Sequence, residues 1–360
     1  MKFDIEDGKS KKKKKDDWSG QSIYLIIAGF LVLVSIILII TYMVLKSGNN
    51  TTQQPVSTPT PVTTKEELSV FDEDSNARPI AVMIDNAIGD AKHAGLLESY
   101  LNYEILVEGG LTRIMAIYKD RDANLIGPIR SSRHYFLDYA LESDAIYVHY
   151  GWSPYAEDDM TKLSIDNING LTDPTPFRRD TNSVAPHNVF TRMSYLKTYL
   201  ESTNYNQESL DWQLFEYSAE LVDLNDTNYI PKSASKVNIP YSEDEYRIYA
   251  YDESNNYYLR SSNGKAQYDR KSGNQLHYTN IIIQRVPNKT IDKEGRQELE
   301  TTGTGSGYYI TGGNYLPIKW SKASREAKTQ YTYADGTEIT LNDGNTFIQI
   351  VPVECDITIE

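Results

Sequence analysis

Two arginines three residues apart make one short segment of this chain well suited to hold an anion. The segment IGPIRSSRHYF, residues 126–136, places Arg130 and Arg133 on either side of two serines, directly after a Gly-Pro pair. Proline favours the first turn of a helix, and residues three apart share a helix face. We therefore predict a helix beginning near Arg130, whose arginines, Ser131 hydroxyl and free N–H groups could cradle phosphate, carboxylate or sulfate.

Other cationic and titratable residues occur where sites usually form in mixed α/β folds, at strand ends and helix starts. Arginines supply hydrogen-bond donors to an anion, and histidines can transfer protons near neutral pH. In a catalytic site, Glu108 or His149 would be the general base, and the arginines would stabilise developing negative charge. The complete candidate set for ligand binding is Arg113, Arg130, Ser131, Arg133, His149, Arg178, Arg179 and His187.

A structural role for these residues is the alternative interpretation. The two central arginines could pair with internal acids, for which the candidates are Asp85, Glu104, Glu108 and Asp138. The histidines could be hydrogen-bonded groups of the core. Both interpretations stay open here, because only the fold can bring these distant segments together.

Motifs for metals and cofactors are missing from the sequence. It contains no HExxH, paired CxxC or DxDxDG motif, so we predict no metal site. The glycine-rich residues 303–314 lack the Lys-Ser/Thr ending of a nucleotide-binding loop and predict a hairpin or lid. No GxSxG motif precedes a predicted helix, and the lone Cys355 is expected to be a small buried apolar residue. We therefore expect no cofactor.

The N-terminal region predicts the cellular location. Residues 23–45 contain no charge, and as a helix they would span roughly 34 Å, enough to cross a bilayer. Lysines are frequent in residues 1–22, so the positive-inside rule predicts a cytoplasmic tail there and an extracytoplasmic remainder. We interpret residues 23–45 as an uncleaved signal anchor in the cell membrane and the Pro/Thr-rich residues 46–69 as an extended linker.

The predicted extracytoplasmic part is more acidic than the whole chain. The full sequence has a net charge of −14, and residues 47–360 contain 28 basic and 45 acidic residues, a net charge of −17. Such a surface repels nucleic acid and other polyanions. We therefore expect no nucleic-acid partner, and any anion site has to be local.

The two halves of this part differ in predicted secondary structure. Residues 70–221 combine buried strands and a diglycine hairpin (EILVEGGLTRIMAIYKD) with three predicted helices, over residues 93–103, from near Arg130, and from a cap near Asn188. Residues 222–360 show short alternating segments separated by Asp-Gly and similar turns, which predict nearly all β structure. The prediction is a mixed α/β fold with its helices in the N-terminal half.

Several segments, in order along the chain, resemble the YerB-like family, a bacterial group of unknown function found mostly in Gram-positive organisms. The segments are RPIAVMIDN, EGGLTRIMAIY, IGPIRSSRHYF, DAIYVHYGWSPYA, FRRD followed by PHNVFT, YTNIIIQ, GGNYLPIKWSKASR and ITLNDGNTFIQIVP. The resemblance implies a layered β-sandwich, N- and C-terminal domains over residues 70–221 and 222–360, and an extracytoplasmic location. Members are often lipoproteins, whereas this sequence has no lipid-attachment cysteine and has the predicted membrane helix instead.

Three functions fit these observations. The first is a non-enzymatic cell-envelope protein that binds an anionic or glycan ligand outside the membrane, because cationic clusters occur without a complete catalytic set. The second is a hydrolase or transferase acting on cell-wall glycan or phosphodiester polymer. The third is a structural partner of envelope proteins that uses the tyrosine-rich β half.

Overall fold

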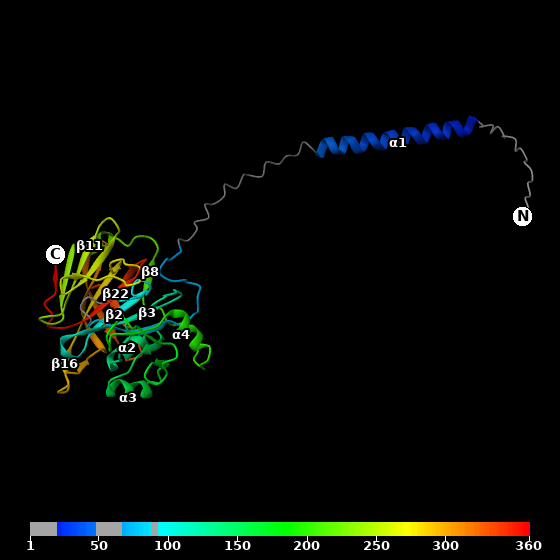
Figure 1. Cartoon of the computed structure of the whole chain (residues 1–360). Coiled ribbons are helices and arrows are strands. Elements are labelled where there is room, and N and C mark those ends of the chain that lie inside the picture. The colour runs from blue at the N-terminus through cyan, green and yellow to red at the C-terminus, as the bar shows by residue number, and fades with distance from the viewer. Residues whose placement is uncertain (1–19, 48–66, 88–92) are drawn as a thin grey trace, which may run out of the picture. The chain divides into compact units, whose positions relative to one another are not determined.

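The computed structural model describes residues 20–47, 67–87 and 93–360. The chain divides into two units, residues 1–64 and 65–360, and the first contains α1 (Gly20–Ser47) (Figure 1). Over the described residues, no helix is long and apolar enough to cross a membrane. The signal anchor of residues 23–45 therefore stays a prediction. The predicted tail, residues 1–22, and the predicted linker, residues 46–69, lie mostly outside the described residues.

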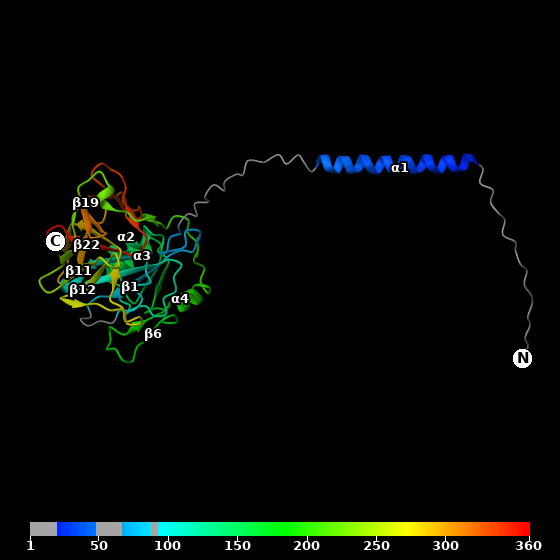
Figure 2. The same cartoon turned by 90° about the horizontal axis from the view of Figure 1, so that it is seen from above.

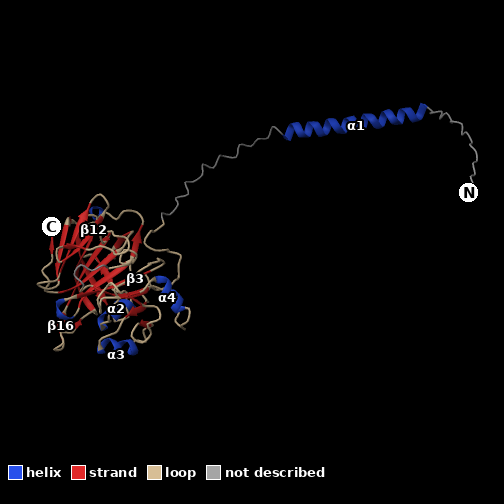
Figure 3. Ribbon diagram, viewed as in Figure 1, coloured by secondary structure: helices blue, strands red, loops and turns tan. Residues whose placement is uncertain are grey.

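Strands dominate residues 65–360 (Figure 3), and the largest sheet has eleven of them. Apolar runs such as IAVMID are buried on both faces of this sheet, as expected for strands covered by other layers. In order, the strands are β20 (Gln330–Thr332), β19 (Asn314–Lys322), β18 (Gly303–Thr311), β15 (Asn280–Val286), β22 (Thr346–Pro352), β2 (Leu101–Leu106), β3 (Thr112–Tyr118), β1 (Ile80–Asp85), β4 (Ile146–His149) and β5 (Asn167–Asn169), with β9 (Lys232–Ser233) paired to β19.

A second sheet covers one face of the large sheet. It contains β13 (Lys265–Ala266), β12 (Tyr257–Ser262), β11 (Tyr246–Asp252), β10 (Lys236–Pro240) and β23 (Thr358–Ile359), with β14 (His277–Tyr278) paired to β12. Three short pairs complete the strands: β16 (Asn288–Thr290) with β17 (Gln297–Leu299), β21 (Thr340–Asn342) with β8 (Glu216–Ser218), and β6 (Arg178–Arg179) with β7 (Val189–Phe190). The short helices η1 (Glu108–Gly110) and η2 (Leu224–Asp226) lie in loops.

Helices cover the other face of the large sheet. α2 (His134–Leu141) and α3 (Pro154–Lys162) lie side by side in both views (Figures 1 and 2). α4 (Met193–Leu200) packs against the opposite core, on the side of the second sheet. α3 is missing from the sequence-based prediction, although its Ser153 cap and N1 proline are typical helix-start signals. The mixed α/β prediction is confirmed, with the helices of this unit in the N-terminal half.

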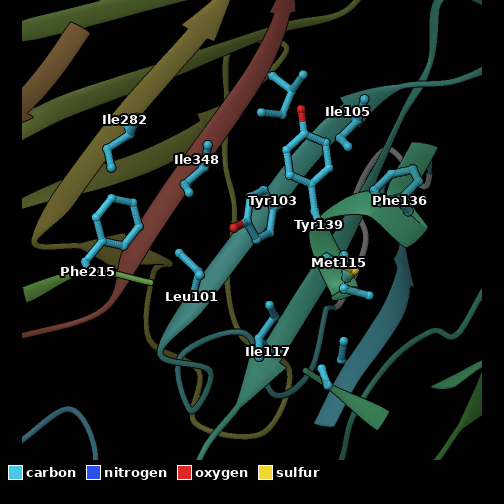
Figure 4. Close-up of a cluster of buried hydrophobic side chains, with 14 of the residues drawn as sticks. Leu101, Tyr103, Ile105, Met115, Ile117, Phe136, Tyr139, Phe215, Ile282 and Ile348 are labelled. Carbon is cyan, nitrogen blue, oxygen red and sulfur yellow. The ribbon is translucent and has the colours of Figure 1, made fainter. Parts of the chain in front are cut away.

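Two cores follow from the alternation of side chains along the strands. In β1, Ala81 and Met83 face the helices, whereas Val82 and Ile84 face the second sheet. Figure 4 shows the helix-side core, where aromatic side chains of α2 meet aliphatic side chains of β2, β3, β15 and β22. The residues labelled there are Leu101, Tyr103, Ile105, Met115, Ile117, Phe136, Tyr139, Phe215, Ile282 and Ile348.

The two sequence halves share the large sheet. β22, from the C-terminal half, lies between β15 and β2 and is parallel to both, with Ile348 opposite Tyr103. Residues 65–360 accordingly form one compact unit. The domain boundary predicted near residue 221 stays a prediction from the sequence. It does not separate the two sheets, because strands from both sides of it belong to the large sheet.

The helix predicted near Arg130 begins four residues later, at His134. The intervening segment is extended because Ile129 bridges to Ile84 of β1, and the N–H of Arg130 donates to the carbonyl of Met83 at 3.0 Å. Arg130 therefore does not share a helix face with the residues of α2, and no arginine cradle forms at a helix N-terminus. This pairing with β1 is a long-range contact that local helix signals do not reveal.

Two other helix predictions are also wrong in part. No helix forms over residues 93–103, because Tyr100 donates its N–H to the carbonyl of Ile117 and β2 begins directly afterwards. The helix predicted from a cap near Asn188 begins at Met193, because the residues after Asn188 pair as β7. The diglycine hairpin is confirmed as the antiparallel pair of β2 and β3 joined through η1.

Candidate functional site

The ends of several strands bring the predicted site residues to one edge of the large sheet. β1 is parallel to β4, and β4 is parallel to β5, while β3 is antiparallel to both β1 and β2. Asp85 therefore ends β1 at the same edge where His149 ends β4 and Asn169 ends β5. Glu108 follows β2 there, and Arg113 lies at the start of β3. Ligand sites in α/β sheets form at this edge.

Arg113 is the most deeply buried of the predicted arginines. Its residue is only 6% exposed, and its Nη1 donates to the carbonyl of Ser131 at 2.7 Å. Among the described residues, it forms no ion pair with a carboxylate. Burial, together with the nearby charges of Arg133 and Arg130, lowers the pKa of Arg113 to about 10, and the charge of Glu108 opposes this shift only in part. A buried guanidinium group without a direct carboxylate partner is unfavourable, and a bound anion would stabilise it.

Arg130 and Arg133 both face internal carboxylates. Arg130 Nε lies 3.2 Å from Asp85 Oδ2, and the same carboxylate accepts a hydrogen bond from Nδ1 of His187. Arg133 binds Glu108 through two contacts, Nε to Oε1 at 2.5 Å and Nη2 to Oε2 at 2.8 Å. Each of these two arginines therefore has an internal carboxylate within ion-pair distance.

The charges nevertheless do not balance at this edge. Among the described residues, three guanidinium groups and His187 face only two carboxylates. We call this group the arginine edge and define it as Asp85, Glu108, Arg113, Arg130, Ser131, Arg133 and His187. Burial raises the pKa of Glu108, but the hydrogen bonds and charge of Arg133 outweigh burial and leave it lowered overall. The Glu108 carboxylate therefore remains ionised, and the excess positive charge resides on the arginines.

Arg179 is connected to the arginine edge by hydrogen bonds through Tyr150, whereas Arg178 is not. Arg179 Nη2 donates to the Tyr150 hydroxyl at 3.2 Å, and the Ser131 hydroxyl donates to the carbonyl of Tyr150 at 3.0 Å. Arg178 instead donates to carbonyls of its own loop and lies over the ring of Tyr195, 4.8 Å from its centroid. Both arginines are exposed, as expected for residues of the short β6 strand.

His149 also lies apart from the arginines. Its side chain is fully buried, with Nδ1 2.8 Å from the carbonyl of Gly151 and Nε2 3.2 Å from Oδ1 of Asn167. Burial lowers the pKa of His149 to about 4, so the ring is neutral near pH 7. A neutral imidazole has one N–H, and the shorter contact assigns it to Nδ1, donating to the carbonyl of Gly151.

The strongest buried charge network is one that sequence reasoning missed. Glu104 of β2, one of the acids considered as a partner for Arg130 and Arg133, binds other arginines. Its Oε1 lies 2.6 Å from Arg247 Nε and its Oε2 lies 2.8 Å from Arg260 Nη2, with all three side chains fully buried. Burial raises the pKa of Glu104, but the two arginines outweigh it and lower the value to about 2. In the sequence, the signal for this network was a glutamate within an apolar strand.

Asp138, the other acid considered, also pairs elsewhere. Its Oδ1 accepts a hydrogen bond from Arg325 Nε at 2.6 Å, and Arg325 Nη1 donates a second hydrogen bond to Asp159 Oδ2 at 2.8 Å.

Within the part of the chain that the structure describes, no group of three or more His, Cys, Asp or Glu residues could hold a metal ion.

The fold and this edge define a mixed α/β protein with two sheets and a cationic strand-end cluster, and the comparisons place it in a family. Residues 67–206 match the N-terminal domain, and residues 237–348 the C-terminal domain, of a family described as "Protein of unknown function (DUF3048)". The chain belongs to this family.

The similar proteins come from Bacillus subtilis. The chain is 29% identical over 276 residues to that organism's protein named "Putative lipoprotein YerB", covering 76% of this chain and 81% of the relative. The crystal structure of the YerB protein from Bacillus subtilis has a TM-score of 0.71 and 27% sequence identity, covering 82% of this chain and 100% of that chain. The resemblance to the YerB-like family is confirmed.

Proposed function

We propose that this chain is a cell-envelope protein whose globular unit binds an anionic ligand at the arginine edge. The observation that carries the proposal is Arg113, which is buried at a strand end without a carboxylate partner among the described residues. Of the five N–H donors of its guanidinium group, only the one at Nη1 has a described acceptor. An anion at this edge would accept the remaining donors and neutralise the excess charge.

Charge-assisted hydrogen bonds make this arrangement effective for a small oxyanion. Hydrogen bonds to charged groups contribute about 1.5–3 kcal/mol each, and the planar guanidinium group matches phosphate and carboxylate oxygens in pairs. The exposed Arg179 lies next to this edge through Tyr150, so a longer anionic ligand could extend onto it. The acidic remainder of the surface favours a ligand whose negative charge is concentrated in one group.

The test measures thermal stability of the full chain with inorganic phosphate, sulfate and polyphosphate. Ligand at 100 times its Kd stabilises a protein by about 2.7 kcal/mol, which predicts a melting-temperature increase of roughly 5–10 °C. Arg113→Met, which removes the charge and keeps the length, should abolish the increase. Arg192→Met, at an exposed arginine that stacks on Tyr195, should preserve it. An equal response in both variants, or none in the native chain, would refute anion binding at this edge.

Binding accounts for these residues better than catalysis does. A general base works best with a pKa near the operating pH. The pKa of Glu108 is lowered by Arg133, and that of His149 is lowered to about 4 by burial. A hydrolase or transferase using either residue would therefore operate with a weak base. Turnover of purified wall polymer that Glu108→Gln abolishes would favour the catalytic function instead.

We also propose an extracytoplasmic location, anchored by residues 23–45, with a cell-wall polymer or envelope protein as partner. The uncharged stretch and the lysines before it support this orientation. The name of the relative includes the word lipoprotein, whereas the single cysteine of this sequence, Cys355, lies in the C-terminal half. Protease added to intact cells should digest residues 65–360, and alkaline washing should leave the full chain with the membrane. Protection of the globular unit from protease would reverse the orientation.

A further inference from the structure

We propose that a second cavity, at the ends of β4 and β5, binds one sugar unit of a neutral glycan. The cavity has a volume of about 400 Å³, within the size range of small-molecule sites. Its walls include the aromatic side chains of Trp152, Tyr199 and Tyr205 and the amides of Asn167 and Asn169. The inference is independent of the arginine edge, because none of the residues that line this cavity belongs to that edge.

The aromatic walls are positioned by contacts to the surrounding fold. Trp152 follows β4 and packs beside His149, with ring centroids 5.5 Å apart. Tyr205 donates its hydroxyl to the carbonyl of Asn167 at 3.0 Å, and Tyr199 comes from α4. All three rings are partly buried, so each combines an apolar face with a polar group. This combination suits a sugar ring, which has apolar C–H faces and a polar rim.

Asn169 supplies a hydrogen-bond donor that the protein does not use. Its side-chain Oδ1 accepts the N–H of Gly151 at 2.9 Å and the N–H of Leu171 at 3.0 Å. These two donors determine the orientation of the amide, so the opposite atom must be Nδ2. Nδ2 is buried and has no partner among the described residues, while the residue as a whole is 4% exposed. An unpaired buried donor is unfavourable, and a sugar hydroxyl or acetamido oxygen would satisfy it.

The charge of the cavity excludes an anion and disfavours a cation. Glu157, which is exposed, lines it, and no lysine or arginine among the described residues does. An anion would therefore meet a negative charge without compensation. Aromatic rings beside a carboxylate can also bind a quaternary ammonium ion. Such an ion has no acceptor for the Asn169 donor, whereas a neutral sugar has both acceptors and donors.

The test titrates the purified full chain with chitotetraose and with cellotetraose, which differ in their acetamido groups, by calorimetry and by tryptophan fluorescence. Asn169→Asp keeps the acceptor oxygen and removes the donor, and Trp152→Ala removes the largest aromatic wall. Each change should weaken tetrasaccharide binding by about tenfold. The matched controls are Asn182→Asp in an exposed loop and Tyr155→Ala on the exposed side of α3, and both should leave binding unchanged.

Several results would overturn the proposal. These are no tetrasaccharide binding by the native chain, or binding that neither Asn169→Asp nor Trp152→Ala weakens. Tetramethylammonium binding that Trp152→Ala abolishes and Asn169→Asp does not would identify a cation site instead. If Trp152→Ala does not fold, as judged by its thermal transition, Asn169→Asp decides the outcome. Phosphate titration of the same samples reports separately on the arginine edge, so failure of one site is distinguishable from failure of the other.

Discussion

Lowering the pH from 6.5 to 5 should remove stability that two buried histidines provide. His93 and His149 are both fully buried, and burial lowers the pKa of each from 6.5 to about 4. For His93, the charge of Arg260 acts in the same direction as burial. In this pH range, the unfolded chain takes up protons at both positions and the folded chain does not. The free energy of unfolding must therefore fall as the pH falls.

The magnitude follows from the two pKa values. Lowering the pKa from 6.5 to about 4 corresponds to about 3.4 kcal/mol per histidine, and this contribution is present above pH 6.5 and lost progressively down to pH 4. Between pH 6.5 and 5, each histidine should account for a loss of about 1.6 kcal/mol, or about 3 kcal/mol for the pair. This range lies above the ordinary titration of carboxyl groups, including Glu104, whose lowered pKa acts only below about pH 4.5.

The assay is urea denaturation followed by tryptophan fluorescence at several pH values from 5 to 7. His149→Gln and His93→Gln each remain neutral, so each should remove about half of the pH dependence, whatever its effect on stability at pH 7. His277→Gln, at a half-buried histidine of β14, is the control and should retain it. A pH dependence that is equal in the native chain and in both core variants would refute the assignment to His93 and His149.

Three further changes test the interior. Glu104→Gln leaves the fully buried Arg260 without its carboxylate and Arg247 with Glu245 alone, and it should destabilise the fold by about 3–5 kcal/mol in urea denaturation, whereas Lys197→Ala, at an exposed ion pair, should cost less than about 1 kcal/mol. Gly151→Ala should also destabilise, by about 1–3 kcal/mol, because its φ of +85° disfavours a side chain; an unchanged urea midpoint would contradict this. Cys355 is buried with a pKa raised to about 11, chiefly by burial, so a thiol reagent should label it at pH 8 only after denaturation.

Local patterns were sufficient for many of the strands, although the first residues of β2 had the pattern of a helix. The apolar run of β1, the diglycine turn between β2 and β3, and the alternating segments of the C-terminal half all appear as predicted. Each depends on neighbours in sequence, through side-chain period and turn chemistry. The helix starts were less predictable, because the segment of Arg130 is drawn into extended pairing by the distant β1, and the residues after Asn188 pair with the nearby β6.

The candidate site also combines features that the sequence predicts with features that only the fold decides. The sequence by itself determined which residue types gather near strand ends, and so it identified Arg113, Arg130 and Arg133 as a group. Only the tertiary structure decided that Arg130 faces Asp85, that Arg133 faces Glu108, and that Arg113 has no carboxylate partner among the described residues. The physical reason is that ion pairing depends on distances of a few ångströms between side chains, and sheet register sets those distances across segments that are remote in sequence.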